Sequence, residues 1–92
     1  MNKYKSVVIV NPNVEENTLK ELIERFQTLI NTDGKVEQVN ELGKKKLAYE
    51  INKNKEGYYV VYDFEANPKL IAELERNYRI TDEIIKFIVV KK

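Results

Sequence analysis

The periodicity of apolar residues along the chain constrains its fold more than any other feature. In two segments, residues 19–30 and 70–78, apolar residues recur every three or four positions, which is typical of amphipathic helices. Shorter segments with continuous or alternating apolar residues come before, between and after them, and these patterns are typical of strands. The sequence therefore predicts the order strand, helix, strand, strand, helix, strand.

The two middle strands are expected to form a hairpin, with a long strand over residues 35–51, a polar turn and a return strand over residues 58–66. The parity of the apolar residues changes near Gly43, which indicates a β-bulge. The predicted fold class is α+β, a ferredoxin-like split β-α-β arrangement (βαββαβ). In it, two helices cover one face of a four-stranded antiparallel sheet, the first and third strands are central, and the second and fourth are edges.

Polar residues indicate where the helices begin. Asn13 and Thr18 each precede a glutamate by three positions, so both are candidate caps of the first helix. Asn67 followed by Pro68 predicts the start of the second helix, because proline is tolerated at the first helical position. Between the helix segments, Gly34 is able to end the first helix with a positive φ.

Composition narrows the possible functions. The chain of 92 residues is long enough for a single domain, 1–92, and it contains no His and no Cys. A zinc finger, a disulfide framework, a cysteine nucleophile and a Ser-His-Asp triad are therefore excluded, and we expect no metal, no cofactor and no enzymatic activity. No apolar stretch approaches the roughly 20 residues that span a bilayer, so we expect no membrane partner and a cytoplasmic location.

Charge is nearly balanced: sixteen Lys and Arg against fifteen Asp and Glu leave a net charge of +1. This argues against binding nucleic acid by bulk charge, so a basic surface has to arise by segregation. The run Lys44 to Lys46 lies on the expected edge strand, where lysines prevent unwanted pairing, and phosphate contact is the alternative. The fold gathers a second basic set around the last strand: Lys3, Lys5, Arg76, Arg79, Lys86, Lys91 and Lys92. By contrast, Arg25 is expected to form a surface ion pair within its helix.

Two further functions find little support in the sequence. Tyr58 and Tyr62 share parity with the apolar residues of the return strand, so they are expected to face the helices and not to stack on RNA bases. Only Tyr59 remains for the open face, together with Asp63 and other acidic residues that repel RNA. A small phosphatase of this fold would need an arginine in a phosphate-binding loop, and the turn at 11–13 has none.

Several segments together resemble the sixth protein of the bacterial small ribosomal subunit. They are Ile9-Val10-Asn11-Pro12-Asn13, the stretch from Glu41 to Ile51 with its Leu-Gly-Lys-Lys-Lys-Leu-Ala-Tyr core, Glu56-Gly57-Tyr58-Tyr59, and Arg79-Ile80 before the last strand. The resemblance covers essentially the whole chain, although Glu50 stands where family members commonly carry proline.

This resemblance implies a structural, RNA-binding protein of the cytoplasmic ribosome, active in translation. It implies binding to the central domain of 16S rRNA as a heterodimer with the eighteenth small-subunit protein. The residues expected to contact RNA are Lys3, Arg79, Lys86 and Lys91. The residues expected to contact the protein partner on the edge strand are Lys46, Leu47, Ala48, Tyr49 and Ile51. The alternative is a stand-alone interaction or regulatory module that self-associates through that open edge.

Overall fold

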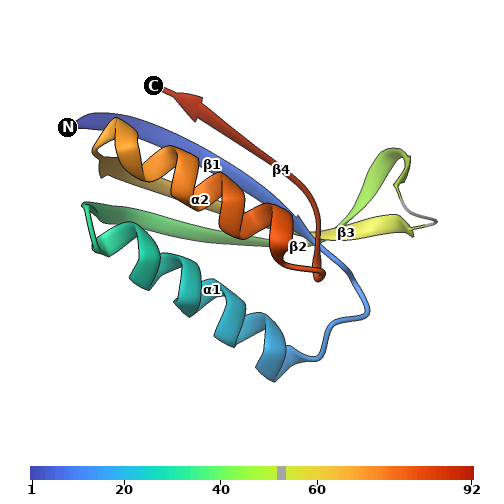
Figure 1. Cartoon of the computed structure of the whole chain (residues 1–92). Helices are drawn as coiled ribbons and strands as arrows, with labels where there is room; N and C mark the ends of the chain where they lie inside the picture. Colours follow the sequence, from blue (N-terminus) through green and yellow to red (C-terminus); the bar gives the residue numbers. More distant parts are fainter. Residues whose placement is uncertain (52–53) are drawn as a thin grey trace.

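A computed structural model describes residues 1–51 and 54–92 of the chain, without the side chains at 48, 49, 51 and 54. Its elements are β1 (Asn2–Val10), α1 (Glu16–Asn31), β2 (Gly34–Ile51), β3 (Asn54–Ala66), α2 (Pro68–Ile80) and β4 (Ile84–Lys91). The strands form one antiparallel sheet in the order β2-β3-β1-β4. Both helices lie on the same face of the sheet (Figure 1). The predicted element order, edge strands and fold class are confirmed.

The core lies between the two helices and one face of the sheet. From the central strand β3, Val60, Tyr62 and Phe64 enter it, and each is at most 1% exposed. They alternate with residues of the opposite face because successive strand residues point to opposite sides of a sheet. The helices close the core through Phe26 of α1 and Tyr78 of α2, whose rings meet edge to face with centroids 4.7 Å apart. The predicted inner faces of the strand and of both helices are thus confirmed.

The start of α1 differs from the prediction. The helix begins at Glu16, and its N-cap residue, Glu15, makes no side-chain capping hydrogen bond. Neither Asn13 nor Thr18 is the cap, so both candidates were wrong. The reason lies in the preceding turn: the backbone N–H of Asn13 donates to Oδ1 of Asn11 at 2.9 Å. This side-chain turn ends the strand before the helix begins.

The start of α2 agrees with the prediction. The helix begins at Pro68, with Asn67 as its N-cap residue. The Asn67 side chain does not cap the helix, because its amide nitrogen donates to Oδ1 of Asp33 at 2.8 Å. The backbone N–H of Asn67 also donates to the Asp33 carbonyl at 3.2 Å. These two bonds join the α1–β2 connection to the β3–α2 connection at one end of the molecule.

A β-bulge interrupts β2 where the parity change predicted it. The register against β3 shifts between Glu41 and Gly43, and Gly43 has a φ of +80°. A left-handed residue at a bulge favours glycine, because a Cβ atom is strained there. Gly34 has no positive φ and instead begins β2, close to the Glu65 carbonyl and to Ala66, where a Cβ atom would collide with the β3 backbone.

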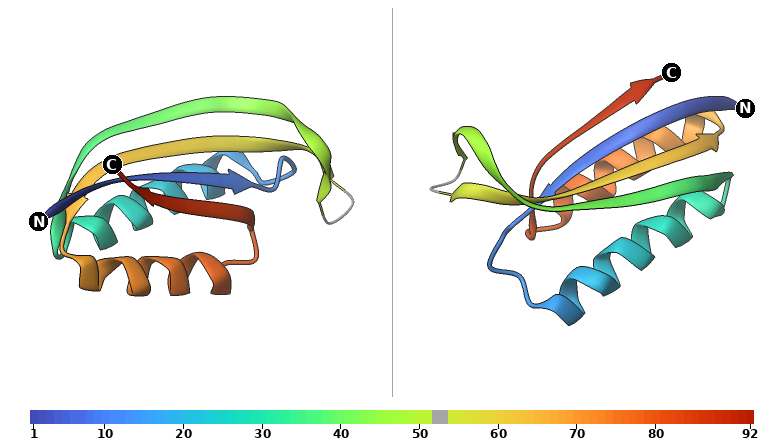
Figure 2. Two further views of the ribbon diagram at one scale, coloured as in Figure 1. Left: turned by 90° about the horizontal axis from the view of Figure 1, so that it is seen from above. Right: turned by 180° about the vertical axis from the view of Figure 1, so that it is seen from behind.

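The hairpin is longer than the sequence indicated. β3 begins at Asn54, four residues before the predicted start at Tyr58, and the turn expected over 52–57 lies partly outside the described residues. β1 pairs with β3 only from Tyr58 to Ala66, whereas β2 continues to pair with β3 beyond Lys44. Residues 45–51 and 54–57 therefore form a two-stranded ribbon, the hairpin arm, which projects past the rest of the sheet (Figures 1 and 2).

Candidate nucleic-acid and partner interface

The face of the sheet that the helices leave open carries an apolar zone, which consists of Val7, Ile9, Tyr59, Val61 and Ile88. The register places Val7 between Val61 and Ile88, and it places Ile9 opposite Tyr59. Ile9 and Val61 are only 8% and 7% exposed, while Ile88 at the edge is 54% exposed. None of the five belongs to the core cluster under the helices. A small apolar cluster thus lies opposite the core, and Ile88 is its exposed member.

Gly57 connects this apolar zone to the hairpin arm. A side chain at Gly57 would collide with Ile9, and the position of its Cβ atom would lie 3.5 Å from a methyl of Leu47 and 3.7 Å from Cδ1 of Ile85. Leu47 of the arm, Ile9 of β1 and Ile85 of β4 therefore approach one another over Gly57, which has no side chain. The apolar zone continues onto Leu47, one of the predicted partner residues.

The predicted partner residues belong to the edge strand β2. β2 is an edge strand, paired only with β3 among the described residues. Lys46 is exposed and pairs with Glu56, and Leu47 is half-buried. Ala48, Tyr49 and Ile51 belong to β2, but their side chains lie outside the described residues. The register against β3 is irregular between Lys46 and Ile51, so the arm is a twisted rather than a flat edge.

The lysine run alternates between the two faces of β2, as its strand position predicted. Lys44 pairs with Tyr58, which faces the helices, and Lys45 pairs with Gly57 on the open face. The Tyr58 hydroxyl donates to Oε1 of Glu41 at 3.1 Å. Burial raises the pKa of Tyr58, and this hydrogen bond raises it further. The run therefore spreads its charge over both sides of the edge.

The structure places two of the four predicted RNA-contact residues near each end of β4 and does not gather the four in one patch. Arg79 and Lys86 line one cavity, between the end of α2 and the start of β4. Lys3 and Lys91 lie at the other end of β4, five residues or roughly 17 Å further along the strand. All four are exposed. The four residues are spread out because β4 is an extended strand, which separates residues at its two ends.

Lys3 and Lys91 also lie on different faces. Lys91 pairs with Tyr4, a core residue, so it projects on the helix side of the sheet. Lys3 pairs with Glu65 on the open face, and its Nζ lies 3.9 Å from a carboxylate oxygen of Glu37. Nearby, Lys92 forms a closer ion pair, 2.6 Å from Oδ1 of Asp63. The acidic residues expected on this face thus balance part of its positive charge.

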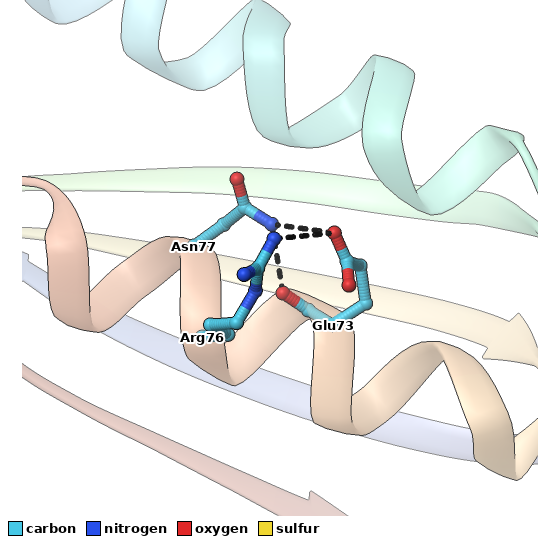
Figure 3. Close-up of polar contacts among 3 residues, drawn as sticks. All are labelled: Glu73, Arg76 and Asn77. Atoms are coloured by element: carbon cyan, nitrogen blue, oxygen red, sulfur yellow. Dashed lines mark hydrogen bonds and ion pairs between the residues drawn. The ribbon is translucent and has the colours of Figure 1, made fainter.

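Two further arginines, Arg76 of the expected basic set and Arg25 of α1, contact other residues of the protein. Arg76 lies 3.5 Å from Oε1 of Glu73, to which Asn77 also donates, on the outer side of α2 (Figure 3). Arg25 does not form the expected ion pair within its helix. It donates to the Thr81 hydroxyl at 2.6 Å, and its guanidinium lies over the Phe26 ring at 5.0 Å. Arg25 therefore joins α1 to the end of α2, a tertiary contact that helix spacing could not indicate.

Sequence reasoning missed two features of this surface. The first is the apolar zone, although a signal was present: the uninterrupted run Val7 to Val10 places apolar residues on both faces of β1. The second is a cation–π contact in which the Arg79 guanidinium lies 5.9 Å from the centre of the Phe87 ring. No local pattern indicates that contact, because it joins a helix to a strand.

The described residues contain no group of three or more acidic side chains placed to hold a metal ion. Within that same part of the chain, no helix has the length and apolar character needed to cross a membrane.

Comparison with known proteins identifies the family. The family model described as Ribosomal protein S6 matches residues 3–91. Small ribosomal subunit protein bS6 of Clostridium novyi is 48% identical over 91 residues, which covers 98% of this chain and 96% of that protein. The protein of the same name from Alkaliphilus oremlandii is 44% identical over 91 residues, covering 99% of this chain and 97% of that protein.

The fold agrees as closely. The crystal structure of 30S ribosomal protein S6 from Thermotoga maritima matches with a TM-score of 0.94 and 38% identity, covering 99% of this chain and 87% of that one. These relatives are ribosomal proteins rather than enzymes. With the family model spanning nearly the whole chain and the fold shared throughout, the chain belongs to the ribosomal protein S6 family of the small ribosomal subunit.

Proposed function

We propose that this small-subunit protein of the cytoplasmic ribosome binds the central domain of 16S rRNA as a heterodimer with the eighteenth small-subunit protein. One observation carries the proposal: the molecule combines an unpaired β2 edge and an adjoining apolar zone with exposed cations at both ends of β4. Apolar area and open strand edges suit a protein partner, whereas exposed Arg and Lys suit phosphates. The chain thereby offers each partner a different part of its surface.

The protein partner adds an extended segment along the β2 edge, at Lys46 to Ile51, and covers the adjoining apolar zone. The unpaired edge supplies backbone hydrogen-bonding groups, and alternate side chains of the added strand reach Leu47 and Ile9. Burial of Ile88, which is 54% exposed, contributes to the same docking. RNA is a poor occupant of this zone, because none of the five residues in the zone is a cation.

RNA contacts come from the cations near the two ends of β4, Arg79 with Lys86 and Lys3 with Lys91. With a net charge of +1, four contacts supply little binding free energy, so the chain alone binds RNA weakly. The partner supplies the remaining positive charge. Phosphate contacts of this kind position a protein on RNA without reading its sequence.

The RNA contacts are tested with the double substitution Arg79→Ala and Lys86→Ala in the heterodimer. The salt dependence of affinity for a central-domain transcript is expected to flatten by roughly one unit of slope for each phosphate that is no longer bound. Lys69→Ala is the matched control, because Lys69 is exposed at the opposite end of α2. An unchanged slope in the double variant overturns the assignment of these two residues.

The protein interface is tested with Lys46→Glu combined with Ala48→Pro. The change reverses a charge and removes a backbone N–H where the β2–β3 register is already irregular, so the domain is expected to stay folded. Binding to the eighteenth protein, followed by calorimetry, is expected to be lost. Ile80→Glu, at an exposed site on the end of α2, is expected to bind normally. If the double variant still binds the eighteenth protein, the interface lies on another part of the surface.

Self-association through the same edge is the alternative function, and the open β2 edge equally fits a second copy of the chain. Two copies paired antiparallel would bring the lysine runs of their edges toward each other, which disfavours this arrangement. Sedimentation of the pure protein separates the two functions: a stable homodimer without RNA affinity favours self-association, and a monomer favours the ribosomal heterodimer.

A further inference from the structure

The connection between α1 and β2 contains an aspartate directly before a glycine, Asp33-Gly34. Of the three glycines in the sequence, Gly34 alone follows an aspartate or an asparagine. The backbone nitrogen after an aspartate is able to attack the carboxyl group of that aspartate, and glycine leaves this nitrogen most accessible because it has no Cβ atom. Asp33-Gly34 is therefore the position in the sequence that is best suited to this cyclisation.

The fold prevents the substitution that would remove this reactivity. Gly34 pairs with Ala66 at the first position of β2, and a Cβ atom on Gly34 would collide with the Glu65 carbonyl. A larger residue would shield the backbone nitrogen, but the close approach of β3 leaves no room for its side chain. The start of β2 therefore requires a glycine directly after Asp33.

Asn67 holds both of the groups that cyclisation brings together. Its side-chain amide donates to Oδ1 of Asp33 at 2.8 Å, and its backbone N–H donates to the Asp33 carbonyl at 3.2 Å. The first bond fixes the carboxylate, and the second fixes the peptide group that contains the Gly34 nitrogen. Both residues are half-buried, at the end of the molecule where the α1–β2 and β3–α2 connections meet (Figure 1). Because an intramolecular attack requires close and aligned reacting atoms, two bonds that fix these groups oppose it.

We propose that Asp33 is a site of spontaneous isomerisation and that its two hydrogen bonds to Asn67, the Asn67 clamp, set the rate. The Gly34 nitrogen forms a bond to Cγ of Asp33, and the hydroxyl of the protonated carboxyl group leaves with the amide proton as one water molecule. The cyclic imide then takes up one water molecule. Addition at the Cγ carbonyl restores aspartate, whereas addition at the main-chain carbonyl gives isoaspartate, so the mass of the protein is unchanged.

Isoaspartate alters the chain at a point where the fold depends on its spacing. It adds one carbon atom to the main chain between α1 and β2, which displaces Gly34 from its register with Ala66. The carboxylate then projects from a different main-chain atom and no longer matches the Asn67 amide. The modification thereby weakens the contact between the two connections.

The test incubates the full chain, Asn67→Ala and Thr81→Val side by side in a mildly acidic buffer. Isoaspartate is measured by enzymatic methyl transfer to its free carboxyl group, and its position by peptide mapping. Asn67→Ala removes the side-chain bond of the clamp, and α2 is expected to keep its start because the Asn67 side chain does not cap the helix. Loss of a hydrogen bond to a carboxylate is expected to raise the rate at Asp33 roughly 10- to 100-fold.

Thr81→Val is the matched control, because it loses hydrogen bonds at the opposite end of α2 and leaves the clamp intact. Its rate of isomerisation is expected to equal that of the wild type. A wild-type rate in Asn67→Ala overturns the clamp. Equal acceleration in both variants overturns it as well, because global unfolding would then set the rate.

The site itself is tested with the wild-type chain unfolded in urea, where the clamp is absent. Isoaspartate is expected to form there faster than in the folded protein, on the peptide that contains Asp33. If the unfolded chain forms none on that peptide, the proposed site is wrong. Asp33→Glu is expected to abolish the signal, because the longer side chain does not form this ring. A signal of unchanged size in Asp33→Glu assigns the modification to another position and contradicts the proposal.

Discussion

The hydroxyl oxygens of Ser6 and Tyr78 lie 2.9 Å apart in the core, where both residues are at most 1% exposed. Ser6 belongs to the central strand β1 and Tyr78 to the last turn of α2. The bond therefore satisfies two buried polar groups and joins α2 to the middle of the sheet. Tyr78 also packs against Phe87, so the same residue connects the core to the edge strand β4.

Ser6→Ala is expected to lower the free energy of unfolding by about 1–3 kcal/mol, because it leaves the buried Tyr78 hydroxyl without a partner. Tyr78→Phe leaves the Ser6 hydroxyl unpaired in the same way. The double variant removes both polar groups, so its loss is expected to be smaller than the sum of the single losses. Urea unfolding measures all three. Strictly additive losses contradict the importance of this bond.

Thr81→Val is expected to cost about 1–2 kcal/mol, since the Thr81 hydroxyl accepts from Arg25 at 2.6 Å and donates to the Asn77 carbonyl at 2.7 Å. Valine keeps the shape of the side chain, so the loss reports the two hydrogen bonds. Thr32→Val is the matched control, because the Thr32 hydroxyl bonds to a carbonyl at an exposed helix end. Its cost is expected to stay below about 0.5 kcal/mol. Equal costs in thermal unfolding contradict a structural role for Arg25.

Gly43→Ala is expected to destabilise the protein by about 1–2 kcal/mol, since its φ of +80° strains any residue with a Cβ atom. No atom lies within 4 Å of the added Cβ, so the cost comes from the backbone alone. Gly43→Asn is expected to cost less, because asparagine tolerates this conformation. Gly34→Ala, where the Cβ atom meets the backbone of β3, is expected to cost more than either. Chemical denaturation ranks the three variants, and a different order disproves the explanation.

Stability is expected to fall above about pH 10. Burial raises the pKa of Tyr62 and Tyr78 above their usual value near 10, although the hydrogen bond to Ser6 partly offsets the effect on Tyr78. The folded state keeps these protons when the unfolded chain loses them, so the contribution is complete below pH 10 and disappears as the pH rises. Each tyrosine contributes a slope of about −1.4 kcal/mol per pH unit.

Tyr62→Phe isolates that contribution, because lysines also titrate in this range in both proteins. Unfolding in urea between about pH 9.5 and 11.5 is expected to show a shallower decline for the variant than for the wild type. Parallel declines contradict the raised pKa of the buried phenol.

Local patterns were sufficient to predict the elements of this fold. The spacing from Leu19 to Ile30 indicated α1, and the parity change indicated the bulge at Gly43, since both depend on residues close in sequence. The N-caps of α1 were wrong because the Asn11 side chain forms its own turn. The early start of β3, before Tyr58, was missed because residues 54–57 are polar or glycine and carry no hydrophobic alternation, yet they continue the β2–β3 ladder.

By itself, then, the sequence determined the order of the elements, the inner faces of the helices and the family, because periodicity and short motifs are local properties. The tertiary structure decided which distant residues meet. It placed the four expected RNA contacts near the two ends of β4, joined Arg25 to Thr81 and brought Arg79 over the Phe87 ring. Strand register and helix packing set these contacts, and both arise from pairing between segments far apart in the chain.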